Sequence, residues 1–62
     1  MLVKDFVMMD KGNNVTYDIR DVEAKGLLLD SRDKNYTRAI YGRYELYSFE
    51  VTGKNKVTLY VS

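Results

Sequence analysis

The sequence predicts a small α+β fold, a four-stranded antiparallel sheet with one or two short helices, in a single domain over residues 1–62. Residues 44–62 contain two alternating apolar and polar runs separated by a short turn, which is typical of a β-hairpin. Residues 15–20 alternate in the same way. A chain of 62 residues allows one small core, because it buries only about 60% of the surface of its unfolded form.

Residues 2–10 are predicted to form a short helix that opens the chain. Four apolar residues recur at the spacing of one helical face: Leu2, Val3, Phe6 and Val7. Gly12, followed by two asparagines, is a suitable end, because both residue types accept the left-handed backbone conformation that closes helices. A strand is the alternative, since Val3, Asp5 and Val7 also alternate with their neighbours.

A strand over residues 15–20 and its antiparallel return over residues 22–29 are predicted next. Val15, Tyr17 and Ile19 share the apolar face of the first strand, and the residues between them are polar. Gly26 lies inside the return run, where a glycine indicates a bulge or a close approach of two backbones.

Residues 30–43 are harder to assign. The polar cluster over residues 30–35, DSRDKN, predicts a loop. Tyr36, Ala39 and Ile40 then follow at helical spacing, and Gly42 is a suitable helix end. A strand that begins near Tyr36 stays open as an alternative, because tyrosine, threonine and isoleucine favour sheets.

The closing hairpin places its turn over residues 52–56, where Gly53 and Asn55 accept positive φ angles. Its apolar face is expected to hold Tyr47, Phe49 and Val51 from the first strand and Val57, Leu59 and Val61 from the second. Its other face is expected to show Ser48, Glu50, Thr58 and Tyr60. The apolar sides of all elements together predict a buried core that contains Phe6, Ile19, Phe49, Val57 and Leu59.

Composition narrows the class of protein. The chain has no cysteine, which favours a reducing, cytoplasmic setting, and no apolar run long enough to span a membrane. The net charge of +1 argues against a general binder of polyanions. The charge is uneven, because residues 1–33 carry five basic and seven acidic residues, whereas residues 34–62 carry five basic and two acidic ones.

No group of residues predicts an enzyme, a metal or a cofactor. The chain has no histidine to activate its serines and threonines, and its four glycines are isolated rather than gathered in a phosphate-binding loop. Two acidic groups, one at Asp18, Asp21 and Glu23 and the other at Asp30 and Asp33, lack the spacing of a calcium loop and have basic neighbours. We interpret both groups as solvated, ion-pairing surface.

The tyrosines are the feature that points to a function. Four of them fall between residues 36 and 47, interleaved with basic residues, and tyrosine and arginine are enriched in the energetic centres of protein interfaces. Filling of a thin core is the alternative structural explanation, and nucleic-acid binding by residues 34–47 is the alternative function. The predicted partner-binding residues are Tyr36, Arg38, Tyr41, Arg43 and Tyr44.

In outline the chain resembles small phage and mobile-element accessory proteins of bacteria. The segments that carry the resemblance are VKDFVMM (3–9), NVTYDIRD (14–21), YSFEV (47–51) and KVTLYV (56–61). It implies an α+β fold and an accessory role, such as that of a phage-encoded inhibitor of a host defence or replication factor, and it transfers no catalytic residue. We therefore expect a non-enzymatic module that binds another protein and blocks its surface sterically. Self-association into a homo-oligomer is a further expectation.

Overall fold

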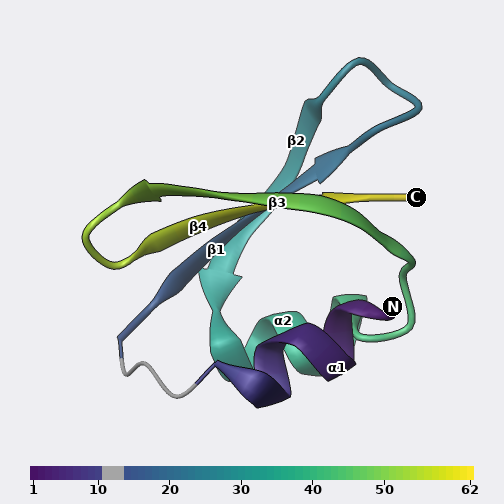
Figure 1. Cartoon of the computed structure of the whole chain (residues 1–62). Coiled ribbons are helices and arrows are strands. Elements are labelled where there is room, and N and C mark those ends of the chain that lie inside the picture. Colours follow the sequence, from purple (N-terminus) through teal and green to yellow (C-terminus); the bar gives the residue numbers. More distant parts are fainter. Residues whose placement is uncertain (11–13) are drawn as a thin grey trace.

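The computed structural model describes residues 1–10 and 14–62. Two helices pack beneath one face of a four-stranded sheet, and the other face of the sheet is open (Figure 1). The order of elements is the predicted one: helix, hairpin, short helix, hairpin. The elements are α1 (Val3–Met9), β1 (Thr16–Asp21), β2 (Leu27–Asp33), α2 (Lys34–Tyr41), β3 (Leu46–Gly53) and β4 (Lys56–Val61).

The strand order is β2-β1-β4-β3, so β2 and β3 form the two edges of the sheet. Both hairpins are antiparallel, but β1 and β4 pair in parallel at the centre, with Tyr17 opposite Val57 and Ile19 opposite Leu59. The sheet is therefore mixed, and the detail that it is purely antiparallel was wrong. Alternation along a strand indicates which face a side chain joins, but it carries no information about the neighbouring strand.

The core lies between the helices and the central strands. Its fully buried side chains are Val3, Val7, Tyr17, Ile19, Leu59 and Val61. The predicted burial of Ile19 and Leu59 is confirmed, and Phe6 and Val57 are partly buried against this cluster. The predicted burial of Phe49 is wrong, because its side chain is 54% exposed on the edge strand β3.

The middle of the chain is more regular than expected. Residues 22–26 form a turn, in which Lys25 and Gly26 adopt positive φ angles of 58° and 82°, and the return strand begins only at Leu27. The loop predicted from residue 30 is wrong, because β2 continues to Asp33 and α2 follows directly. The Asp33 carboxylate accepts a hydrogen bond from the Tyr36 amide at 2.8 Å, which caps the first turn of α2.

The two helices approach closely where α2 ends. Gly42 caps α2, as predicted, and its carbonyl accepts a hydrogen bond from the Lys4 amide at 3.0 Å. A Cβ atom at Gly42 would lie 2.2 Å from the Arg38 carbonyl oxygen and 3.1 Å from Lys4 Cβ. Glycine is therefore required mainly by the last turn of α2 itself, and the approach of α1 leaves little room for a side chain on the other side. The predicted end of α1 at Gly12 lies outside the described residues.

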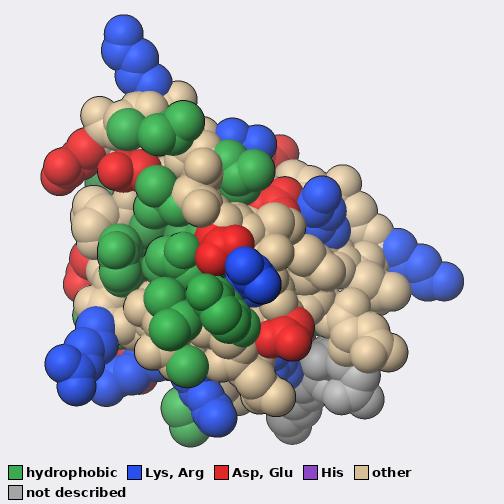
Figure 2. Space-filling view, turned by 180° about the vertical axis from the view of Figure 1, so that it is seen from behind, with side chains coloured by type: hydrophobic (Ala, Val, Ile, Leu, Met, Phe, Trp, Pro, Cys, Tyr) green, Lys and Arg blue, Asp and Glu red, His purple; other side chains and the backbone are tan. Residues whose placement is uncertain are grey.

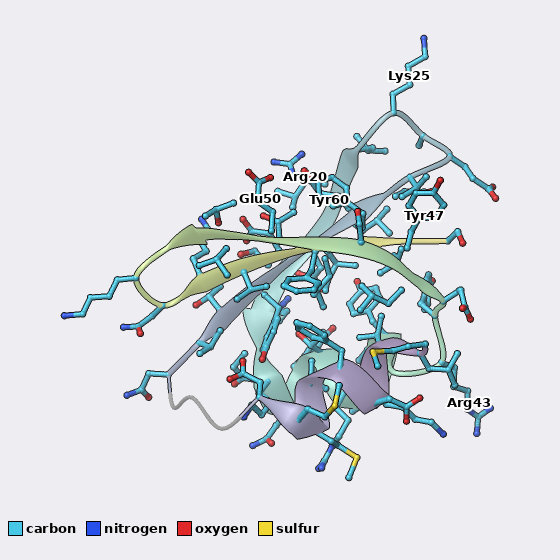
Figure 3. All side chains as sticks on the ribbon, viewed as in Figure 1. Arg20, Lys25, Arg43, Tyr47, Glu50 and Tyr60 are labelled. Carbon is cyan, nitrogen blue, oxygen red and sulfur yellow. The ribbon has the colours of Figure 1, made fainter. Side chains whose placement is uncertain are left out.

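A bulge changes the faces of β3. The pairing shifts between Leu46 and Ser48, so Tyr47 is an extra residue in the strand. Figure 3 shows Tyr47 on the open side of the sheet, the side on which Glu50 and Tyr60 also lie. Its predicted place on the apolar face is therefore wrong, whereas Glu50 and Tyr60 lie on the open side as predicted.

Candidate functional site

The candidate site is the surface formed by β2 and α2, which we call the β2–α2 face. Asp30 and Arg32 of β2 pair with Ile19 and Tyr17 of β1, whose side chains belong to the core on the helix side of the sheet. Because paired residues share a face, the side chains of Asp30 and Arg32 also turn toward the helix side, where α2 lies. There they meet the aromatic side chains of α2 and of the residues after it.

Five side chains form a continuous row across this face. Arg32 lies over the ring of Tyr36, with the guanidinium carbon 4.5 Å from the ring centre. Its Nε donates a hydrogen bond to Asp30 at 2.9 Å, and the Tyr41 hydroxyl donates to the other oxygen of the same carboxylate at 3.0 Å. The ring of Tyr41 packs edge-to-face on Tyr44 at a centre-to-centre distance of 5.4 Å. The order of the aromatic–ionic row is thus Tyr36, Arg32, Asp30, Tyr41 and Tyr44.

The contacts within the row fix its protonation states. The hydrogen bond from Arg32 lowers the pKa of Asp30 below its ordinary value, and the same bond raises the pKa of Arg32. Burial, followed by the hydrogen bond to Asp30, raises the pKa of Tyr41. At neutral pH the row therefore holds an ionised carboxylate between a charged guanidinium and a neutral phenol. The hydrogen bonds and ring contacts also restrict the side chains of the row before any partner binds. A surface of this kind loses less side-chain entropy when it binds a partner.

Exposed aliphatic side chains border the row. Ile40 of α2 is 53% exposed, and Leu27 at the start of β2 is 60% exposed. Leu29 is the extra residue of a bulge in β2 and is also exposed. Figure 2 shows hydrophobic side chains gathered on this face, with charged groups among them and around them. Contiguous apolar patches on small monomeric proteins mark interaction surfaces more often than chance.

The predicted residues divide into two groups. Tyr36 and Tyr44 are exposed ends of the row, and Tyr41 is a half-buried member whose ring also packs against the core. Arg38 and Arg43 are exposed outside the row, and neither side chain forms a hydrogen bond or ion pair with another described residue. Figure 3 shows Arg43 pointing away from the sheet beyond the end of α2. The structure thus unites the three tyrosines and leaves the two arginines at the border.

Sequence reasoning missed the contribution of β2. Asp30 and Arg32 were assigned to a loop, and the three leucines before them were assigned to an ordinary return strand. The spacing of Asp30 and Arg32 in fact places both on one face of a strand, next to a helix that begins at Lys34. The polar composition of the segment hid this pattern, because strand edges carry charges as commonly as loops do.

Two acidic residues of β1, outside this face, are engaged with neighbouring residues. Asp18 accepts a hydrogen bond from Ser31 and lies 3.4 Å from the Lys56 ammonium, while Asp21 accepts one from the Glu23 amide. Within residues 1–10 and 14–62 no cluster of acidic side chains is arranged to hold a metal ion. Neither described helix has the length and apolarity needed to cross a membrane.

No protein-family model, curated protein or solved structure matches this chain.

Proposed function

We propose that the chain is a non-enzymatic protein-binding module whose contact surface is the β2–α2 face. The observation that carries the proposal is the aromatic–ionic row, which is held in one arrangement by its own contacts and is bordered by exposed aliphatic side chains. Rigid tyrosines and paired arginines of this kind give a large contact area at a low cost in side-chain entropy.

The charges of the face define the chemistry of the partner. Asp30 and Arg32 neutralise each other inside the row, whereas the exposed side chains of Arg38 and Arg43 place two positive charges at its border. A complementary partner surface has an apolar or aromatic centre and acidic side chains at its rim. The proposed mechanism is steric, because a domain of 7.2 kDa covers the surface of the partner that it occupies. The resemblance to phage accessory proteins supports an inhibitor that acts on a bacterial host protein.

Substitution of an exposed residue on this face tests the proposal. Ile40→Asp places a charge in the middle of the aliphatic border, while Val51→Asp makes the same kind of change on β3, at the opposite edge of the sheet. Each variant is immobilised at a density low enough to keep the copies apart, so that loss of self-association at β3 does not affect the result. It is then exposed to a bacterial lysate, and retained proteins are identified by mass spectrometry. We expect a partner that the original chain and Val51→Asp retain and Ile40→Asp loses.

Calorimetry with that partner then measures the size of the effect. Tyr44→Ala should weaken binding by about 2 kcal/mol or more, as expected for an exposed aromatic anchor of an interface. A partner that binds Ile40→Asp and Val51→Asp equally well would place the interface elsewhere. Binding that weakens steeply with salt, through Arg38 and Arg43, would instead indicate nucleic acid as the ligand.

A further inference from the structure

The outer edge of β3 is open over a short, defined stretch. The N-terminus covers its beginning, where Leu2 bridges to Glu45 and the Leu46 amide donates a hydrogen bond to the Met1 carbonyl at 2.8 Å. A second irregularity in pairing lies between Val51 and Gly53. Between these limits, over residues 47–51, no described strand pairs with the outer side of β3. An antiparallel strand leaves alternate backbone groups on its free side, so this stretch can accept another strand.

An apolar groove runs along the helix side of the same edge, between α1 and β3. Its volume is about 310 Å³, and its lining residues are Phe6, Met9, Asp10, Phe49, Val51 and Val57. The rings of Phe6 and Phe49 pack with their centres 4.7 Å apart, yet Phe49 is 54% exposed, Met9 61% and Val51 67%. The groove and the free edge therefore form one surface, with backbone groups on the edge and apolar side chains beside them.

We propose that this surface binds a second copy of the same chain, through antiparallel pairing of the two β3 strands about a two-fold axis at Phe49. The centre of the free stretch, residues 47–51, is Phe49. Pairing there sets the two Phe49 side chains opposite each other, next to Phe6 of each copy. The result is a continuous eight-stranded sheet with all four helices on one side.

The charge pattern of β3 selects this register. If one copy's β3 is shifted by one residue relative to the other, residues that point to the helix side become opposite residues that point to the open side. Paired residues in a continuous sheet point to the same side, so this register is excluded. Moving the two-fold axis by one residue, to Glu50, keeps paired side chains on the same side. It also sets the two Glu50 carboxylates opposite each other, which is destabilising. With the axis at Phe49, Glu50 of one copy instead faces Ser48 of the other. An axis at Ser48 sets each Phe49 opposite Tyr47 of the other copy, and Tyr47 points to the open side of the sheet. Among axes at Ser48, Phe49 and Glu50, the axis at Phe49 is therefore the one that pairs the two phenylalanines and keeps the two carboxylates apart.

A stable dimer needs more contact area than the edge strand alone provides. A standard interface removes about 800 Å² from each partner, which is about a fifth of the 4304 Å² exposed by this chain. Strand pairing over a few residues covers less than that. The groove adds apolar surface to the contact, because Met9, Phe49 and Val51 are exposed beside the edge that faces the second copy.

Sedimentation equilibrium of the full chain over a broad range of concentration tests the association. We expect a species of twice the 7.2 kDa chain mass at high concentration. Val51→Lys should raise the dissociation constant by about tenfold or more, because the two-fold axis introduces each charge twice. Met8→Lys is the matched control, since Met8 is 68% exposed, close to the 67% of Val51, and does not line the groove. If Val51→Lys fails to fold, Tyr47→Lys, at a residue 74% exposed on the same stretch, replaces it.

Single cysteines test the register, because the chain has none of its own. Residues at a two-fold axis between antiparallel strands lie about 4.5–5.5 Å apart, within the range that a disulfide needs. Phe49→Cys should therefore form a disulfide-linked dimer under mild oxidation faster than Glu50→Cys or Met8→Cys. Faster cross-linking through Glu50→Cys would overturn the register.

A chain that stays monomeric at every concentration, or equal effects of Val51→Lys and Met8→Lys, would overturn the proposal.

Discussion

Phe49 and Leu59 are cross-strand neighbours with different environments. They are opposite each other in the β3–β4 hairpin and point to the same side of the sheet. Leu59 belongs to a central strand and is fully buried, whereas Phe49 belongs to an edge strand and is 54% exposed. The sequence indicates their common face through alternation, but burial depends on how far the helices extend over that face. Helix α1 is too short to cover the edge, so one face holds both a core residue and a surface residue.

The two residues should therefore respond differently to truncation. Leu59→Ala should lower the free energy of unfolding by about 2–5 kcal/mol, because it leaves a cavity in the core. Phe49→Ala should cost about 1 kcal/mol, since roughly half of a buried phenylalanine's transfer energy is involved. Urea unfolding at a concentration low enough to keep the copies apart measures both values. Equal losses would show that Phe49 is part of the monomer's core.

At the scale of elements, the sequence predicted most of the framework. Helix α1, strand β1 and the β3–β4 hairpin form where their apolar periods predict them, and α2 takes the helical alternative and ends at the predicted Gly42. The position of β2 and the parallel contact of β1 with β4 could not be predicted, because both depend on pairing between distant segments. For the same reason, the sequence revealed only a part of the candidate site. Its tyrosines form a local cluster, whereas Asp30 and Arg32 join them only through the β2–α2 contact.

Asp33 couples β2 to α2 and offers a test at this scale. Its carboxylate accepts the Tyr36 amide hydrogen bond that begins α2, and its backbone ends β2. Asp33→Ala should lower the free energy of unfolding by about 1 kcal/mol, the usual cost of losing a helix cap. Asp33→Asn should restore most of it, because asparagine caps equally well. Thermal unfolding followed by circular dichroism measures both, and an effect of Asp33→Asn as large as that of Asp33→Ala would point to the charge rather than the cap.

At the scale of the whole molecule, the two proposed surfaces lie on opposite edges of the sheet. The β2–α2 face is at one edge and the β3 edge is at the other, with the central pair β1 and β4 between them (Figure 1). A dimer formed through β3 therefore leaves both β2–α2 faces accessible. Such a dimer binds a multivalent or oligomeric partner more tightly than one copy does, because the second contact is intramolecular.

The final prediction concerns how the free energy of unfolding of the whole chain changes with pH. The chain has no histidine and no cysteine, so its stability should be nearly constant between about pH 5 and 9. On the acid side, Asp30 has a pKa lowered by the hydrogen bond from Arg32. Its contribution is present above the ordinary aspartate value of 3.8 and is lost as the pH falls through the lower value of the folded state.

On the alkaline side, Tyr17 of the core dominates. Burial, then the hydrogen bond that its hydroxyl donates to Asp10, raises its pKa above the ordinary value of 10.0. Its contribution is therefore present below pH 10.0 and is lost as the pH rises through the folded-state value. Tyr17→Phe should cost about 0.5–1.5 kcal/mol at neutral pH, for one lost hydrogen bond, and should remove much of the alkaline decline. Urea unfolding across the pH range tests this, with Asp30→Asn as a comparison that should alter the acid side and, through the pKa of Tyr41, a part of the alkaline side that does not depend on Tyr17. An alkaline decline of unchanged size in Tyr17→Phe would show that another group governs it.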